Sequence, residues 1–107
     1  MRWLASLVVM AACGSEDPTC RTSYLNYDNF GAPFMTSWCD GCHGEAIPPG
    51  MRQGANADVN FDTLDEVRQR GAEIVQEAGK SHLMPPAGGP TDAEREMLVE
   101  WVTCGAR

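Results

Sequence analysis

Two cysteines and a histidine stand close together near the middle of the chain, in the order Cys39-Asp40-Gly41-Cys42-His43. This is the Cys-x-x-Cys-His sequence to which a c-type haem is attached. The two thiols add across the two vinyl groups of the porphyrin as thioethers, and the histidine that follows supplies the proximal nitrogen to the iron. The sequence therefore predicts one haem c per chain, anchored by Cys39 and Cys42, with His43 as the proximal iron ligand.

Two other kinds of site use similar residues. A redox-active dithiol would want a strand before the first cysteine and a helix after the second, whereas a segment rich in Gly and Pro follows at 44–50 and no strand pattern precedes. A zinc site could combine the two thiols with His82 or Cys104, but Cys42 and the adjacent His43 rarely both reach one tetrahedral ion. Haem attachment is favoured over both alternatives.

A proximal histidine leaves one axial position of the iron open, and the Pro- and Gly-rich segment 81–90 offers a ligand for it. Met84 precedes two prolines, which stiffen the backbone around it. A thioether ligand needs no proton, and a His/Met pair raises the reduction potential of the iron. Met84 is the predicted distal ligand, and the alternatives are His82 as a second imidazole or an open sixth position. Met35 and Met97 lie on predicted helix faces, where a methionine more often fills the core.

The first 12 residues have the pattern of a bacterial secretory signal. Arg2 supplies one positive charge, and the apolar run 3–12 carries none, yet it is shorter than the roughly 20 residues that a membrane span needs. The run ends in Met10-Ala11-Ala12-Cys13, which is similar to a lipobox although Leu usually stands where Met10 does. We expect lipidation of Cys13 and a lipid-anchored protein on the periplasmic side of the bacterial cell envelope, with ordinary signal cleavage as the alternative.

Export places the chain in an oxidising compartment, where spare thiols form disulfides. Once Cys13, Cys39 and Cys42 are assigned, Cys20 and Cys104 remain, one near each end of the folded part. We predict that these two form a disulfide. Closing so long a loop stabilises the folded state by about 4.5 kcal/mol on the chain-entropy model.

The elements that must position these groups are predicted to be short helices. Asp or Thr before an apolar stripe marks three of the starts, and in two cases Glu three residues later completes a capping box. Helices are expected at about 29–38 after Asp28, 64–70 after Thr63, 72–78, and 92–104 after Thr91. The segment 44–60 is expected to be an irregular loop. Strand-type alternation appears nowhere in the sequence, so the predicted class is all-α.

The composition limits the other possibilities. A chain of 107 residues forms one domain, which excludes a two-domain enzyme with a closing cleft. Its 15 acidic and 8 basic residues give a net charge of −7, which disfavours binding to nucleic acid and suits a protein partner with a basic face. We expect a monomer in which residues 1–12 are the signal peptide, 13–26 the lipidated cysteine and a tether, and 27–107 the haem domain.

With these features together, the chain resembles a class I c-type cytochrome in a bacterial lipoprotein form. The resemblance lies in the segment 31–39, the Cys39–His43 motif, Met84-Pro85 and the segment 91–101, and it covers about residues 27–104. It implies three to four short helices around one haem, with Cys39 and Cys42 as thioether anchors and His43 and Met84 as axial ligands. It also implies single-electron transfer rather than enzymatic catalysis. A haem peroxidase or gas sensor with an open or labile sixth position is the alternative.

The resemblance carries two further expectations about packing. In this family the N- and C-terminal helices cross, which would place Gly31 at the crossing against Trp101. A proline near the motif commonly accepts a hydrogen bond from the proximal imidazole through its carbonyl. Pro48 or Pro49 would have that role here.

Overall fold

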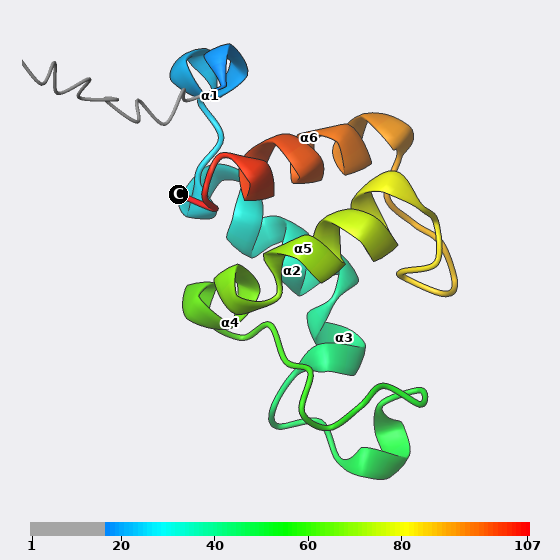
Figure 1. Cartoon of the computed structure of the whole chain (residues 1–107). Helices are drawn as coiled ribbons and strands as arrows, with labels where there is room; N and C mark the ends of the chain where they lie inside the picture. The colour runs from blue at the N-terminus through cyan, green and yellow to red at the C-terminus, as the bar shows by residue number, and fades with distance from the viewer. Residues whose placement is uncertain (1–16) are drawn as a thin grey trace, which may run out of the picture.

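The structure is a computed structural model that describes residues 17–107 (Figure 1). The described part contains six α-helices, three further segments of π- or 3-10 helix, and no β-strand. In chain order they are α1 (Pro18–Thr22), the π turn η1 (Tyr27–Gly31), α2 (Ala32–Trp38), α3 (Asp40–His43), the 3-10 turn η2 (Pro49–Met51), α4 (Leu64–Gln69), α5 (Gly71–Ile74), the π turn η3 (Val75–Lys80) and α6 (Asp92–Thr103). The all-α class is thus confirmed for residues 17–107.

The α-helices number six rather than three to four. Two of the breaks fall at single residues, because Cys39 (φ −115°) and Arg70 (φ −112°, ψ 21°) depart from ideal helical dihedral angles. None of the helices within residues 17–107 is long and apolar enough to cross a membrane. The predicted signal peptide 1–12 and the predicted lipidation site Cys13 lie outside the described residues.

The helical segment η1–α2 begins earlier than Asp28 predicts. Its cap is Asn26, whose Oδ1 accepts a hydrogen bond from the backbone N–H of Asn29 at 2.8 Å, while the side-chain oxygen of Asn29 accepts one from the N–H of Asn26 at 2.8 Å. The two asparagines satisfy each other's unpaired backbone donors as a Ser/Thr–Glu capping box does. Asp28 therefore lies in the first turn, where a negative charge favours the helix N-terminus.

The two capping boxes predicted with glutamate are present. Thr63 Oγ1 accepts from the N–H of Glu66 at 3.2 Å and Thr91 Oγ1 accepts from the N–H of Glu94 at 3.1 Å. Each glutamate carboxylate in turn accepts from the N–H of its threonine. The helices start where the sequence predicts, at Leu64 and Asp92.

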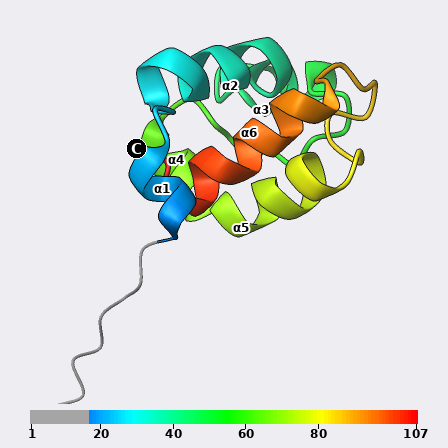
Figure 2. The ribbon, with the colours of Figure 1, turned by 90° about the horizontal axis from the view of Figure 1, so that it is seen from above.

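Helix α6 lies between α2 on one side and α5 with η3 on the other, as the view from above shows (Figure 2). Two glycines let α5 and η3 approach α6. A Cβ atom at Gly79 would lie 2.5 Å from Val99 Cγ2, and one at Gly71 would lie 3.0 Å from Val102 Cγ1. Together α5 and η3 form one helical segment from Gly71 to Lys80, which includes the predicted short helix 72–78.

The expected contact between Gly31 and Trp101 is present. Trp101 is 1% exposed, and a Cβ atom at Gly31 would overlap its six-membered ring. The indole also stacks on Tyr27 with ring centroids 6.4 Å apart and receives the edge of Phe30 at 6.0 Å. Its Nε1 donates to the carbonyl of Arg107 at 3.0 Å. The core of the domain is thus built around this one indole.

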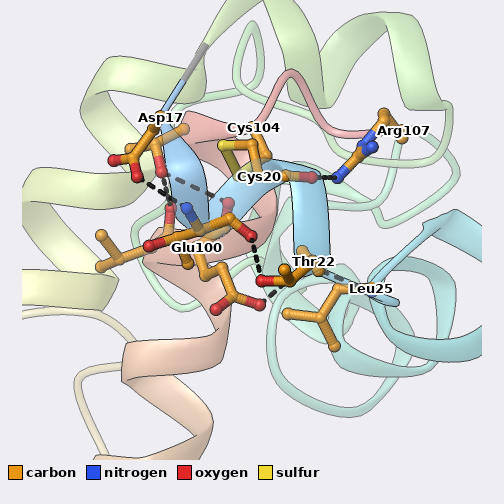
Figure 3. Close-up of a disulfide and its surroundings, with 11 residues drawn as sticks. Asp17, Cys20, Thr22, Leu25, Glu100, Cys104 and Arg107 are labelled. Carbon is orange, nitrogen blue, oxygen red and sulfur yellow. Dashed lines mark hydrogen bonds between the residues drawn. A yellow bond between two sulfur atoms is a disulfide. The ribbon is translucent and has the colours of Figure 1, made fainter.

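The expected pair Cys20–Cys104 lies at disulfide distance, with the two sulfurs 1.98 Å apart across 84 residues of sequence (Figure 3). The bond attaches α1 to the end of α6, and Arg107 Nη2 donates to the carbonyl of Cys20 at 2.8 Å. Nearby, Ser23 Oγ donates to Glu100 Oε2 at 2.8 Å. Part of the segment expected to be a tether, from residue 17 onward, is therefore helical and packed on α6.

We predict that Gly31→Ala lowers the free energy of unfolding by about 1–2 kcal/mol, measured by chemical denaturation. Gly31 has helical dihedrals (φ −62°, ψ −53°), so alanine would by itself favour the helix by up to about 1 kcal/mol. The overlap with the buried indole outweighs this gain, because overpacking a core costs about 1–3 kcal/mol. The control is Gly50→Ala, where a Cβ atom meets nothing within 4 Å. An equal effect of both substitutions would contradict the close contact at Gly31.

Candidate functional site

The four predicted haem-contacting side chains meet in one cavity of about 310 Å³. Cys39, Cys42 and His43 reach it from the junction of α2 and α3, and Met84 reaches it from the loop before α6. Most of the rest of the wall is apolar and includes Trp38, Val59, Phe61, Ile74, Ala78 and Pro85. The structure therefore brings together side chains that are about 40 residues apart in sequence.

The imidazole of His43 is fixed in orientation by a backbone carbonyl. Its Nδ1 lies 2.9 Å from the oxygen of Val59. A carbonyl oxygen can only accept a hydrogen bond, so Nδ1 carries the proton and the neutral ring has its lone pair on Nε2. The ring of Phe61 packs against the imidazole with centroids 5.1 Å apart. Nε2 is thus the nitrogen available to a metal, as is usual for a ligating histidine.

The expectation that Pro48 or Pro49 supplies this carbonyl is wrong. Pro48 caps the 3-10 turn η2 and Pro49 begins it, and the carbonyl of Pro48 accepts from the N–H of Met51 at 2.8 Å. The acceptor is instead Val59, 16 residues after His43. Nothing in the local sequence marks Val59 for this role, because the contact depends on how the loop 44–60 folds back.

That loop is organised by Arg52, which sequence analysis did not single out. Arg52 is 2% exposed although it is charged. Its guanidinium donates to the backbone carbonyls of Gly44 (2.6 Å), Asn56 (2.8 Å) and Val59 (3.0 Å), to Asn60 Oδ1 (2.8 Å) and, more weakly, to the carbonyl of Ala55 (3.4 Å). The carbonyls of Gly44 and Asn56 also accept from backbone N–H groups within turns, and Arg52 adds donors that join these turns to Val59. A loop of irregular structure is thereby given one conformation.

A second buried arginine holds the loop that carries Met84. Arg95 on α6 is 3% exposed, and its Nη1 lies 2.7 Å from the carbonyl oxygens of both Met84 and Ala78. The N–H of Met84 donates to the carbonyl of Glu77 at 2.9 Å, so the backbone of Met84 is held on both sides. Arg95 lies three residues before the buried Leu98. That spacing places a charge on the apolar face of a helix, and it was the one sequence signal that Arg95 is buried.

The same loop closes against the cavity wall at Gly89. Its φ is +130°, a backbone conformation that favours glycine, and a Cβ atom there would overlap the ring of Trp38. Trp38 itself lines the cavity. The segment between Met84 and α6 therefore packs directly on one wall of the site.

The other residues considered for the sixth position lie elsewhere. The side chain of His82 is 69% exposed and lies outside the cavity, with its Nε2 3.1 Å from Asp92 Oδ1. Met35 is 1% exposed in the core and Met51 is 67% exposed on the surface. Of the methionines within residues 17–107, only Met84 lines the cavity.

The zinc and dithiol alternatives find little support in the geometry. Within the described residues no group of three or more His, Cys, Asp or Glu side chains is placed to hold a metal ion, and the sulfur of Cys104 is bonded to Cys20. Burial, and then the charge of Asp40, raises the pKa of the Cys39 thiol to about 12, whereas a redox-active dithiol requires a lowered pKa. Cys39 and Cys42 are both free thiols.

Comparison with known proteins gives no further guide, since the chain matches no protein-family model, no curated protein and no solved structure. The residues of the cavity are therefore the basis on which a function can be inferred.

Asp40, between the two cysteines, has an unusual ionisation. Burial, followed by the negative charges of Asp62 and Glu66, raises the pKa of its carboxyl from an ordinary 3.8 to about 6. The folded protein therefore binds more protons than the unfolded chain between about pH 4 and pH 6. Stability contributed by this group is present at low pH and is lost as the pH rises through that window.

We predict that Asp40→Asn abolishes the loss of stability between about pH 4 and pH 6. After allowance for solvent screening, the variant should be more stable than the parent by about 1 kcal/mol at pH 7 and equally stable near pH 4. The measurement is urea denaturation at a series of pH values. The control is Glu96→Gln on the exposed face of α6, which removes one charge without relieving a buried one. A pH dependence that is unchanged in Asp40→Asn would show that the carboxyl is not perturbed.

Proposed function

We propose that the protein is a small monohaem c-type cytochrome that carries single electrons between larger redox proteins. The observation that carries this proposal is the meeting of Cys39, Cys42, His43 and Met84 at one largely apolar cavity. The packing of Gly31 against Trp101 supports the cytochrome c fold that the sequence resembles.

The residues fit a covalently bound haem. The free thiols of Cys39 and Cys42 are available to form the two thioethers, His43 offers Nε2 as the proximal ligand, and Met84 offers its sulfur as the distal ligand. When bound, the haem supplies a one-electron couple between ferric and ferrous iron. The apolar wall excludes water, and a thioether ligand favours the reduced iron, so both features raise the reduction potential.

A carrier is favoured over a haem enzyme because protein side chains are available for both axial positions. Peroxide chemistry would want a distal histidine or arginine over the iron. His82, the second histidine of the described part, is outside the cavity, with its Nε2 3.1 Å from Asp92 Oδ1. Arg52 donates to the carbonyl of Val59, which orients His43, and Arg95 donates to the carbonyl of Met84. These contacts would keep both ligands in place, which would lower the structural reorganisation that accompanies electron transfer.

The proposed location is the periplasmic side of the bacterial cell envelope, with the domain tethered to the membrane through a lipid at Cys13. A disulfide between Cys20 and Cys104 is in keeping with such an oxidising compartment. The domain would be a monomer that binds redox partner proteins and no nucleic acid.

Replacement of the distal ligand tests the function. We expect the reduced wild-type holoprotein to show a covalently bound haem whose visible spectrum is unchanged by carbon monoxide, because both axial positions are filled. Met84→Ala should bind carbon monoxide and lose its high potential. The control is Met51→Ala, which removes an exposed methionine outside the cavity.

Each other outcome has a definite meaning. A large carbon monoxide shift in the wild type would favour the gas sensor or peroxidase over the carrier. A wild-type protein without a haem band, after expression with a haem-attachment system, would exclude both.

The surface charge predicts how the carrier meets its partner. Burial of Arg52 and Arg95 withdraws two of the eight basic residues from a surface that already has an acidic excess. We expect electron exchange with a redox protein that has a lysine-rich docking face to slow at least tenfold between about 10 mM and about 500 mM salt, because salt screens the attraction. A rate that does not change over this range would argue against electrostatic steering.

A further inference from the structure

The carbonyl that orients the proximal imidazole has a second donor. Val59 oxygen accepts from His43 Nδ1 at 2.9 Å and from Arg52 Nη2 at 3.0 Å. A guanidinium is always protonated, so one of the two donors on this oxygen carries a full positive charge. Arg52 is thus one hydrogen-bond acceptor away from the proposed proximal ligand.

The charge of Arg52 is buried without a carboxylate beside it. All five of its acceptors are neutral oxygens, four of them backbone carbonyls and the fifth Asn60 Oδ1. The ion pairs found within residues 17–107 join Arg70 to Glu73 and His82 to Asp92, and neither includes Arg52. Gly54, Ala55 and Asn56, the residues that follow Arg52 closely in the loop, line the cavity. A positive charge in this position acts through a medium of low dielectric constant, where its field is weakly screened.

We propose that Arg52 sets the reduction potential by disfavouring the oxidised state of the bound haem; this rests on the proposed function. Two effects act in the same direction. A carbonyl shared with a cationic donor is a weaker acceptor for the Nδ1 proton, so the imidazole is a poorer electron donor to oxidised iron. The buried charge itself also opposes the extra positive charge that oxidation adds at the iron. Arg52 acts here as a positioning and tuning residue and does not touch the iron.

A purely structural role for Arg52 makes a different prediction. If Arg52 only holds the loop 44–60 together, any substitution that loosens the loop should lower the potential by admitting water, whatever its charge. The two roles are separated by changing the charge and the hydrogen bonds independently.

The experiment is a spectroscopic redox titration of the holoprotein and four variants. Arg52→Gln keeps a donor and removes the charge, whereas Arg52→Lys keeps the charge and loses most of the hydrogen bonds. Asn60→Asp places a carboxylate beside Arg52 and so neutralises its charge with the arginine still present. Asn60→Ala is its matched control, because both changes remove the hydrogen bond from Asn60 Nδ2 to the carbonyl of Ala57.

We expect Arg52→Gln and Asn60→Asp to lower the ratio of reduced to oxidised protein at a fixed potential by about three- to tenfold. A tenfold change corresponds to 59 mV for a one-electron couple. Arg52→Lys and Asn60→Ala should stay within about twofold of the wild type. In addition, the Nδ1 proton of His43, followed by NMR of the reduced protein, should exchange no faster in Arg52→Gln, since it becomes the principal donor to Val59.

The inference is overturned if Arg52→Lys and Asn60→Ala shift the ratio as far as Arg52→Gln and Asn60→Asp do, or if none of the four shifts it. Should Arg52→Gln fail to fold, the comparison of Asn60→Asp with Asn60→Ala decides alone. A wild-type protein that lacks a bound haem or binds carbon monoxide defeats the proposed function instead. A six-coordinate wild type with unshifted variants defeats only the role of Arg52.

Discussion

Two buried guanidinium groups, those of Arg52 and Arg95, hold the two loops that shape the cavity. The loops supply much of its wall yet contain little regular structure, so turns and side chains satisfy their carbonyls. Two of these carbonyls, those of Gly44 and Asn56, also accept from a backbone N–H within a turn. Each arginine donates to several carbonyls at once, and each reaches one that matters to the site, that of Val59 in one loop and that of Met84 in the other. The conformation of both loops, and with it the position of Met84 and of the carbonyl that orients His43, depends on these contacts.

The helices give the two loops a common support. Trp101 fills the space that Gly31 leaves open, and Gly71 and Gly79 allow α5 and η3 to lie close along α6. Arg95 projects from this same helix α6 to the loop that carries Met84. The aromatic core is therefore connected through α6 to the Met84 side of the cavity, whereas on the His43 side Arg52 belongs to the loop that it organises.

The sequence predicts the features that residue types and their positions along the chain determine. The Cys39–His43 spacing, the Thr63 and Thr91 capping boxes and the Cys20–Cys104 pair each follow from the residue types and their positions. The N-terminal cap was missed because Asn26 and Asn29 form a capping box without the usual Thr and Glu. Val59 and the two buried arginines were missed for a different reason. The contacts of Val59 and Arg52 depend on how the loop 44–60 folds back in three dimensions, which no local pattern marks. Arg95 was marked only by its place on the apolar face of α6.

The disulfide has a consequence for resistance to proteolysis. Cys20 and Cys104 enclose all the residues that line the cavity within one covalent ring. A protease that cuts one exposed peptide bond in the loop 44–60 would leave both fragments joined through the two sulfurs. The two fragments would stay in one molecule, because α1 is fixed to the end of α6. Two cuts, or one cut and a reductant, are needed before any piece of this domain can diffuse away.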